Sequence, residues 1–202
     1  MNITLTHCFL HQAHDLPGLL DGCVKLSTFK NRLQKQALLH PNRYDPNLYV
    51  GDGFELFVEA LIKLSPVDNR IGISDYQCVE DQDVGVDGSG TGFNGKPATV
   101  QVKFRGDGSS VLTANNDHLS NFTSASVLHF GVAPEDNKNM LIVTTAKGLH
   151  HFTDNEMYSN KVRCLGWEQL RELVDNNQAF WDSFRRLVEE SGTTEVTQLL
   201  VG

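Results

Sequence analysis

The chain has 202 residues, of which 40% are hydrophobic, so it can bury a substantial core as one domain with an appendage. Acidic residues outnumber basic ones by 25 to 17, and the net charge of −8 is unfavourable for a protein that would bind nucleic acid over its whole surface. No apolar run approaches the roughly 20 residues that cross a bilayer, and Met1–Thr4 lacks the basic start of a signal peptide, so we expect a cytoplasmic protein without a membrane partner.

The first predicted element is a basic helix. Ser27 is placed to cap it, and apolar residues at helical spacing carry it to about Leu39. Pro41 and Pro46 indicate that a loop follows.

The second predicted helix spans Phe54–Leu64. It is apolar except at Glu55, Glu59 and Lys63, which recur every four residues and form one polar stripe. We therefore expect a helix that is buried on all sides but one, with Glu59 pairing with Lys63.

Three strands are predicted next, at Ile71–Val79, Val84–Gly88 and Ala98–Phe104, because these runs are rich in Ile and Val and are separated by turn residues. Asn115–Ser126 is typical of a polar helix, and Met140–Thr144 of a buried strand that is parallel to its neighbour.

A strand at Val162–Leu165 and two helices complete the chain. The last helix is expected to bury Phe180, Trp181 and Phe184 in the core. Strand pairs and helix crossovers in one chain predict an α/β fold with a central mixed sheet.

One stretch within this order gathers groups that could carry out chemistry. Strand side chains alternate between faces, so Gln101 and Lys103 share one face while the neighbouring valines point into the core. Asp87 closes the preceding apolar run, and a hairpin over residues 88–97 would bring its carboxylate beside Gln101. An aspartate, an amide oxygen and a lysine suit phosphodiester hydrolysis by a water molecule that Mg²⁺ activates.

A helix with a glutamate, a hairpin with Asp87 and the Gln101-x-Lys103 pattern, and then a helix and a strand follow in an order that resembles the PD-(D/E)XK nuclease superfamily. Within that superfamily, the order is most similar to the Mrr-like restriction endonuclease domains. The resemblance covers about residues 50 to 190 and lies in residues 53–55, 83–88, 100–104, 119–122 and 141–145. It implies a restriction-endonuclease-like αβββαβ core, with a central mixed sheet flanked by helices and with C-terminal helices. It also implies a nuclease-like domain over 49–191, an N-terminal segment over 1–48 that could contribute DNA binding or specificity, and a tail over 192–202.

The resemblance also assigns roles. Asp87 is the central metal carboxylate, Gln101 takes the second ligand position, Lys103 is the motif lysine, and Glu55 is the helix glutamate that completes the site. The ion would be Mg²⁺, with Mn²⁺ as a substitute, and the Val102 carbonyl would be a further ligand. Many members have Glu or Asp at the position of Gln101, and a neutral amide contributes less charge to the ion.

Each of these residues also has a purely structural explanation. Asp87 with Gly88 could turn the chain, and Gln101 with Lys103 could be the solvent face of an amphipathic strand. Asp52 and Glu55 fit a capping box at the start of a helix. Glu59 is an alternate acid on the same stripe.

Several other residues are weaker candidates for the site. Asp83 is a second candidate carboxylate, although it and Glu80 are better explained as solvated turn residues. His118, His150 and His151 need no function, since an exposed or packed histidine is common.

The charge is unevenly distributed along the chain. Residues 23–44 carry five bases and no acid, whereas residues 168–202 carry seven acids and three arginines. We expect DNA contacts in the basic segment and after the motif strand, at Lys30, Arg32, Lys35 and Arg105.

The sequence therefore predicts a magnesium-dependent DNA endonuclease of a restriction or phage-encoded kind. A homodimer or a targeting protein could supply specificity. One alternative is a catalytically silent protein that keeps the nuclease fold and binds DNA or a partner, and a second is a junction or repair nuclease.

Overall fold

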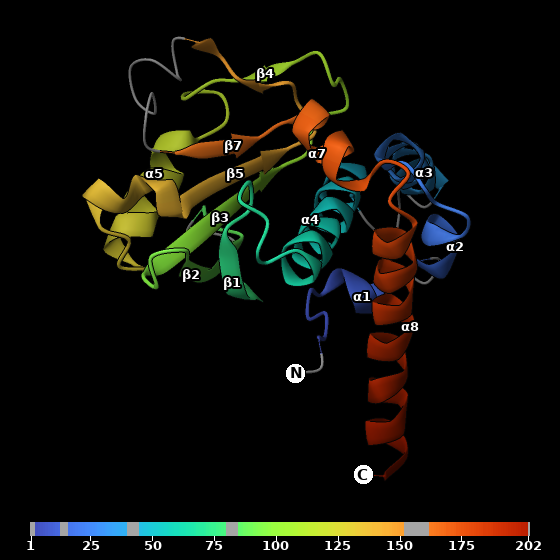
Figure 1. Cartoon of the computed structure of the whole chain (residues 1–202). Helices are drawn as coiled ribbons and strands as arrows, with labels where there is room; N and C mark the ends of the chain where they lie inside the picture. Colours follow the sequence, from blue (N-terminus) through green and yellow to red (C-terminus); the bar gives the residue numbers. More distant parts are fainter. Residues whose placement is uncertain (1–2, 13–15, 40–44, 80–84, 152–161, 202) are drawn as a thin grey trace. The chain divides into compact units, whose positions relative to one another are not determined.

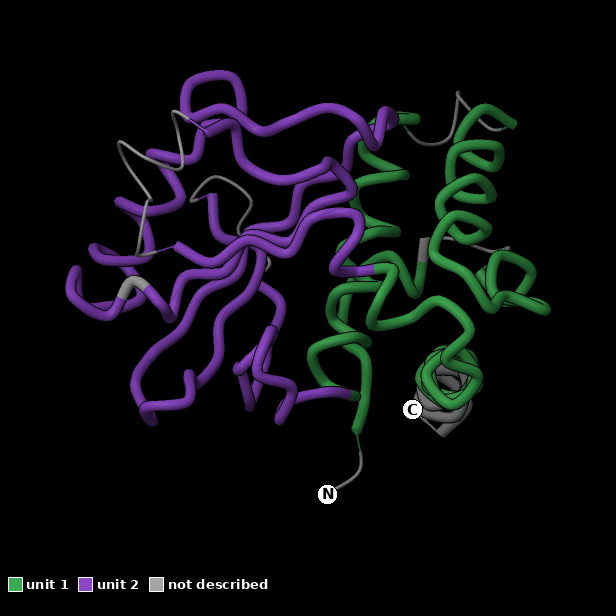
Figure 2. The backbone as a smooth tube through the Cα atoms, turned by 45° about the horizontal axis from the view of Figure 1, so that its top comes forward, with its two compact units in different colours: residues 1–64, 171–202 green, residues 65–170 purple. Residues whose placement is uncertain are grey.

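The chain divides into two units in the computed structural model (Figure 1). Unit 1 comprises residues 1–64 and 171–202, and unit 2 comprises residues 65–170 (Figure 2). The structure describes residues 3–12, 16–39, 45–79, 85–151 and 162–201. This division differs from the expected one at residue 49, because the helix that carries Glu55 packs with the N-terminal and C-terminal helices.

Unit 1 is helical and is built around an aromatic cluster. Its helices are α1 (Phe9–Gln12), α2 (Leu16–Leu20), α3 (Leu26–Leu39), α4 (Pro46–Leu64) and α8 (Gln178–Val201). Phe57 of α4 lies 5.7 Å from Phe29 of α3 and 6.1 Å from Trp181 of α8, measured between ring centroids. Such pairs contribute about 0.5–1.5 kcal/mol beyond the burial of their area. The predicted basic helix and the inward aromatic residues of the last helix are confirmed.

Helix α4 begins at Pro46 and not near Phe54, so the loop expected around Pro46 is wrong at that residue. The Asp45 carboxylate accepts hydrogen bonds from Asn47 N at 2.8 Å and Leu48 N at 3.3 Å, which caps the helix. Pro46 takes the first helical position, where its missing N–H costs nothing. Asp52 and Glu55 therefore lie inside the helix, and the capping box predicted for them is wrong.

Helix α8 continues to Val201, so the backbone expected as a tail over 192–202 is helical as far as that residue. The boundary between the two units falls within α7 (Trp167–Val174).

Unit 2 contains a five-stranded mixed sheet in the order β1-β2-β3-β5-β7. Strands β1 (Ile73–Cys78), β2 (Gly88–Gly92) and β3 (Pro97–Lys103) form an antiparallel meander, and β5 (Met140–Thr144) and β7 (Arg163–Leu165) are added in parallel. The predicted α/β class with a central mixed sheet is confirmed at this level.

The second strand was misplaced, because β2 starts at Gly88, where the predicted strand ends. Its sequence, Gly-Ser-Gly-Thr-Gly, has the composition of a turn. A Cβ atom at Gly90 would lie 2.5 Å from the Ser74 carbonyl oxygen of β1. Gly90 is thus needed for close approach of β1 and β2 and not for a bend in the chain.

Helix α5 (Leu119–Leu128) connects β3 to β5 in chain order and buries Leu119 and Phe122 completely. It starts four residues later than predicted. Three short elements were not predicted: β4 (Val111–Leu112) and β6 (Gly148–Leu149), which pair in parallel, and the 3₁₀ helix η2 (Pro134–Asn139). Among the described residues, no helix combines the length and apolarity needed to cross a membrane.

Candidate metal sites

Asp87 immediately precedes β2 and is bound to β3. Its N–H donates to the Val100 carbonyl at 2.9 Å, and its Oδ2 accepts the Val102 N–H at 2.6 Å. The carboxylate therefore takes the place of a backbone acceptor at the end of the β2–β3 ladder. Because β2 begins at Gly88, the chain does not turn at Asp87–Gly88, and the turn explanation for Asp87 is wrong.

Gln101 lies one position beyond the last pair of that ladder, where Gly88 is opposite Val100. Its side chain is buried, with an exposed fraction of 2%, so it does not belong to a solvent face. The Nε2 atom donates to the Gly85 carbonyl at 3.1 Å. This bond fixes the orientation of the amide, since the flipped amide would set oxygen against oxygen.

The other end of the Gln101 amide lacks a partner. Within the described part of the chain, Oε1 is buried and accepts no hydrogen bond. A buried acceptor without a partner costs about 1–3 kcal/mol. Such an atom needs either a donor or a cation.

Lys103 follows Gln101 on the same face of β3 and is half-buried. Its backbone carbonyl accepts the Thr144 hydroxyl at 2.7 Å, which ties the strand end to β5. The Val102 N–H points to Asp87, and the N–H and C=O groups of a strand residue face the same neighbour. The Val102 carbonyl is therefore directed to the side on which Asp87 lies.

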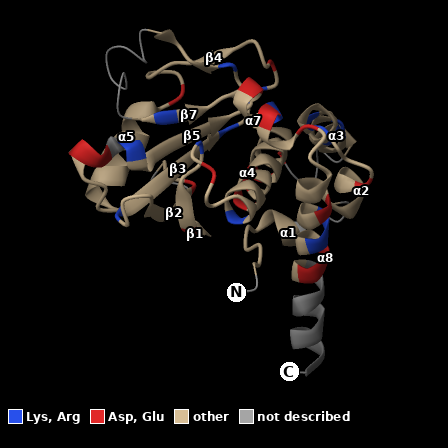
Figure 3. Ribbon diagram, viewed as in Figure 1, with Lys and Arg blue, Asp and Glu red and all other residues tan. Residues whose placement is uncertain are grey.

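The residues expected to contact DNA differ in how accessible they are. Lys30 is buried, with an exposed fraction of 8%, and Arg32 donates to the carbonyl oxygens of Leu19 and Asp21. Lys35 is exposed on α3. Figure 3 shows that charged residues of both signs lie on α8, so the basic segment is not the only charged part of unit 1.

Arg105, the remaining expected DNA contact, is bound within unit 2. Its guanidinium forms an ion pair with Asp117, whose side chain is buried, and it donates to the Phe104 carbonyl at 2.7 Å. Burial lowers the pKa of Arg105. Part of its hydrogen-bonding capacity is thus already used by the protein.

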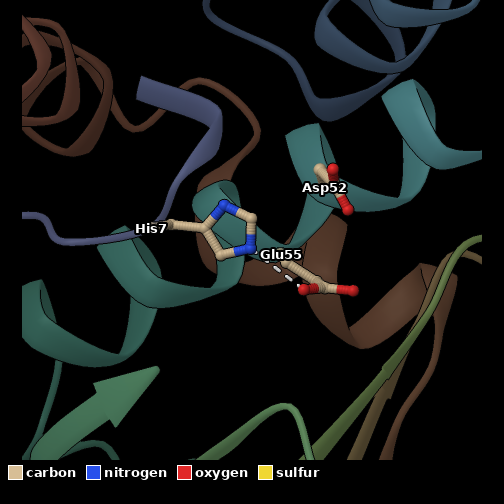
Figure 4. A group of neighbouring side chains, drawn as sticks. All are labelled: His7, Asp52 and Glu55. Atoms are coloured by element: carbon tan, nitrogen blue, oxygen red, sulfur yellow. Dashed lines mark hydrogen bonds and ion pairs between the residues drawn. The ribbon is translucent and has the colours of Figure 1, made fainter. Parts of the chain in front are cut away.

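Glu55 lies in unit 1, where it meets a histidine that sequence reasoning missed. Its Oε2 is 3.0 Å from His7 Nε2, and Asp52 lies one helical turn earlier on α4 (Figure 4). The His7, Asp52 and Glu55 ligand atoms all lie within 4.8 Å of one another. We call these three residues the His7 cluster.

The His7 ring is held in a defined tautomer. Phe9 N donates to His7 Nδ1 at 3.2 Å, so Nδ1 carries no proton and Nε2–H donates to Glu55. Burial by itself lowers the pKa of His7, but the Glu55 hydrogen bond and the charges of Glu55, Asp52 and Glu59 outweigh it and raise that pKa.

Glu59 has a structural role and is unsuited to the alternate-acid role. It is fully buried and accepts hydrogen bonds from Thr6 N and Oγ1 at 2.8 Å, from His7 N at 3.1 Å and from Lys63 Nζ at 2.7 Å. The predicted Glu59–Lys63 pair is confirmed. The polar stripe expected to be open is instead covered there by the N-terminal segment, which supplies these donors.

Among the described residues, the weaker candidates add no ligand to the candidate sites. Asp83 and Glu80 lie outside the described residues. His118 is exposed and has a left-handed backbone, with φ 54°. His150 and His151 pack ring to ring at 4.6 Å.

Sequence reasoning missed His7 and Asp52 as members of a cluster. The i, i+3 spacing of Asp52 and Glu55 was a usable signal once both were known to be helical. No comparable signal marked His7, which is 45 residues away from Asp52 in sequence.

Comparisons of the chain with models of protein families, with curated proteins and with solved structures found no match.

Proposed function

We propose that the protein is a Mg²⁺-dependent DNA endonuclease and that Asp87, Gln101 and Lys103 form its catalytic site. The observation that carries the proposal is the buried Gln101 Oε1 atom, which has no partner among the described residues and lies on the strand face that Lys103 shares. An oxygen of this kind, next to an aspartate, is what a hard divalent cation needs.

The donor set fits magnesium. Asp87 supplies a carboxylate, Gln101 an amide oxygen, and the Val102 carbonyl is directed to the same side as Asp87. All are oxygen ligands, and Mg²⁺ prefers one or two carboxylates together with carbonyl oxygens and water.

The proposed roles follow from these positions. Mg²⁺, when bound, would lower the pKa of a water molecule and offset charge on the phosphate. Asp87 and Gln101 would hold the ion at the end of the β2–β3 ladder. The Lys103 ammonium, which makes no hydrogen bond to the described residues, would orient the attacking water or balance the charge that develops on the phosphate. The family resemblance implies a product with a 5′ phosphate.

The order of elements supports the same proposal. Helix α4, the meander β1–β3, helix α5 and strand β5 occur in the order of the αβββαβ core that the family resemblance implies, with β4 and η2 between them. Strand β5 is parallel to β3, as a crossover through α5 requires.

Glu55 belongs to unit 1, and its expected role as a ligand of the same ion remains a prediction. Replacing it with Gln tests that role, since the change keeps the size of the side chain and removes the charge.

A silent nuclease-like protein that binds DNA or a protein partner is the second candidate. It is favoured by the neutral Gln101 where many nucleases have an acid, by the net charge of −8 and by the burial of Lys30. The two candidates differ in whether any DNA is cut.

The test is a cleavage assay with purified protein on duplex, single-stranded and branched DNA, with Mg²⁺, Mn²⁺ or chelator. We expect metal-dependent cutting of at least one substrate, with the preferred substrate separating a restriction-type from a junction or repair nuclease. Asp87→Asn should reduce the rate at least about 100-fold, because it removes the only carboxylate assigned here from unit 2. Glu135→Gln, at an exposed acid of unit 2, is the control and should leave the rate unchanged. DNA binding without cutting of any substrate would favour the silent candidate.

A further inference from the structure

We propose that the His7 cluster binds a divalent transition-metal ion through His7 Nε2, Asp52 and Glu55. These residues all belong to unit 1, and the inference does not depend on Asp87, Gln101 or Lys103; it assigns Glu55 to this ion instead of to the Mg²⁺ of the proposed nuclease site. The ion would join the N-terminal segment to α4.

The distances between the three ligand atoms are close to those between ligands of a bound ion. With bond lengths of about 2.1 Å, two ligands of a tetrahedral ion lie about 3.4 Å apart. His7 Nε2 and Glu55 Oε2 are already within that spacing, at 3.0 Å. Because no pair exceeds 4.8 Å, side-chain shifts of at most about 1.4 Å would complete the set.

The backbone holds these ligands in place. Asp52 and Glu55 are three residues apart on α4 and so share one face of the helix. His7 is fixed independently, since its N–H donates to the buried Glu59 carboxylate at 3.1 Å. Ligands held on a helix and a pinned segment lose little entropy when an ion binds.

Burial and charge favour a cation at this place. His7 and Asp52 are 7% and 6% exposed, and Figure 4 shows the three side chains converging from the N-terminal segment and α4. Glu59 is paired with Lys63, whereas Asp52 and Glu55 lie beside the His7 imidazole. A divalent ion would be attracted by the two carboxylates that lie close to the imidazole.

The chemistry of the donors selects the ion. One imidazole nitrogen with two carboxylate oxygens suits Zn²⁺ or Mn²⁺ better than Mg²⁺ or Ca²⁺, which prefer oxygen alone. Three protein ligands would leave one position of a tetrahedral zinc ion to water.

Binding at Nε2 leaves a specific signature on the ring. The ion takes the place of the Nε2 proton, so a neutral imidazole then carries its proton on Nδ1. The Phe9 N–H now donates to Nδ1, and that hydrogen bond would be lost. The imidazole of His7 should therefore change tautomer when the ion binds.

The experiment is a zinc titration of the full chain in the presence of excess Mg²⁺, followed by calorimetry and by the ¹⁵N shifts of the histidine rings. We expect His7 to change from the Nε2–H to the Nδ1–H tautomer at one equivalent of zinc. His7→Ala and Asp52→Asn should each weaken this binding at least tenfold. Asp52→Asn preserves the size of the side chain and keeps the test valid should His7→Ala not fold.

Two controls separate this site from other zinc binding. His11→Ala removes an exposed histidine of α1, and Asp87→Asn changes the proposed nuclease site; neither should alter the affinity. The proposal is overturned if His7 keeps its Nε2 proton at saturating zinc, or if both cluster variants bind zinc as tightly as the wild type. Loss of DNA cleavage in Asp87→Asn with unchanged zinc binding would show that the two sites succeed or fail separately.

Discussion

The side-chain amide of Gln101 forms a hydrogen bond through its nitrogen but not through its oxygen within the described residues. Its Nε2 donates to Gly85, while Oε1 is buried without a partner in the described residues. A side chain selected for stability alone would not keep such an atom, because an apolar side chain of similar shape avoids its cost. The unpaired oxygen supports the proposal that Gln101 is a metal ligand.

Replacing Gln101 with Met tests this explanation. The change removes an unpaired acceptor and also the hydrogen bond to Gly85, two effects of about 1 kcal/mol and of opposite sign. We expect the free energy of unfolding without metal to change by less than about 1 kcal/mol, as measured in urea, while stabilisation by Mg²⁺ disappears. A loss of several kcal/mol without metal would instead identify Gln101 as a structural residue.

Among single residues, the shared face of Gln101 and Lys103 could be predicted from the sequence, because a strand has a simple period and fixes which side chains share a face. The burial of Gln101 was not predictable, since it depends on both faces of β3 being covered. His7 was not predictable either, because its contact with Glu55 depends on how a segment 48 residues away returns to α4.

At the scale of elements, the two glycines of α4 differ in how closely other atoms pack against them. Among the described residues outside the adjacent backbone of α4, no atom lies within 4 Å of a Cβ added at Gly51, whereas a Cβ at Gly53 would lie 2.5 Å from Leu33 Cδ2 of α3. One glycine therefore weakens the helix without an evident packing role, and the other lets α3 and α4 approach.

We expect replacement by alanine to change the free energy of unfolding in opposite directions at these two positions. Gly51→Ala should raise the free energy of unfolding by about 0.5–1 kcal/mol, because alanine has the higher helix propensity. Gly53→Ala gains the same propensity but must displace the buried Leu33, so we expect a net loss of about 1–3 kcal/mol. Denaturant unfolding of both variants measures the difference, and equal stabilisation by both would contradict the packing of α3 on α4.

Elements with a clear period were predicted well. Helix α3 and strand β5 lie where their apolar patterns placed them. Strand β2 was misplaced because Gly88 and Gly90 lie too close to β1, and Gly92 too close to Asn139, for a side chain, which is a tertiary effect. Helix α4 was predicted too short because Asp45–Pro46 was assigned to a loop, although it is also a helix start.

At the scale of the molecule, the proposed chemistry is assigned to an acidic protein. A net charge of −8 opposes the approach of DNA, and of the four predicted DNA contacts only Lys35 is exposed, while Arg32 and Arg105 are half-buried and Lys30 is buried. A bound divalent ion would reduce this repulsion at the point where the phosphate has to enter. Cleavage should therefore depend on the metal both for chemistry and for binding.

The most direct test of the account is the metal-dependent rate of DNA cleavage by Lys103→Ala, with Lys138→Ala as the matched control at an exposed lysine of unit 2. If Lys103 orients the water or balances charge on the phosphate, its loss should lower the rate about 100-fold or more, while the variant remains folded and the control cuts like the wild type. Undiminished cutting by Lys103→Ala would contradict the catalytic site proposed at the end of β3.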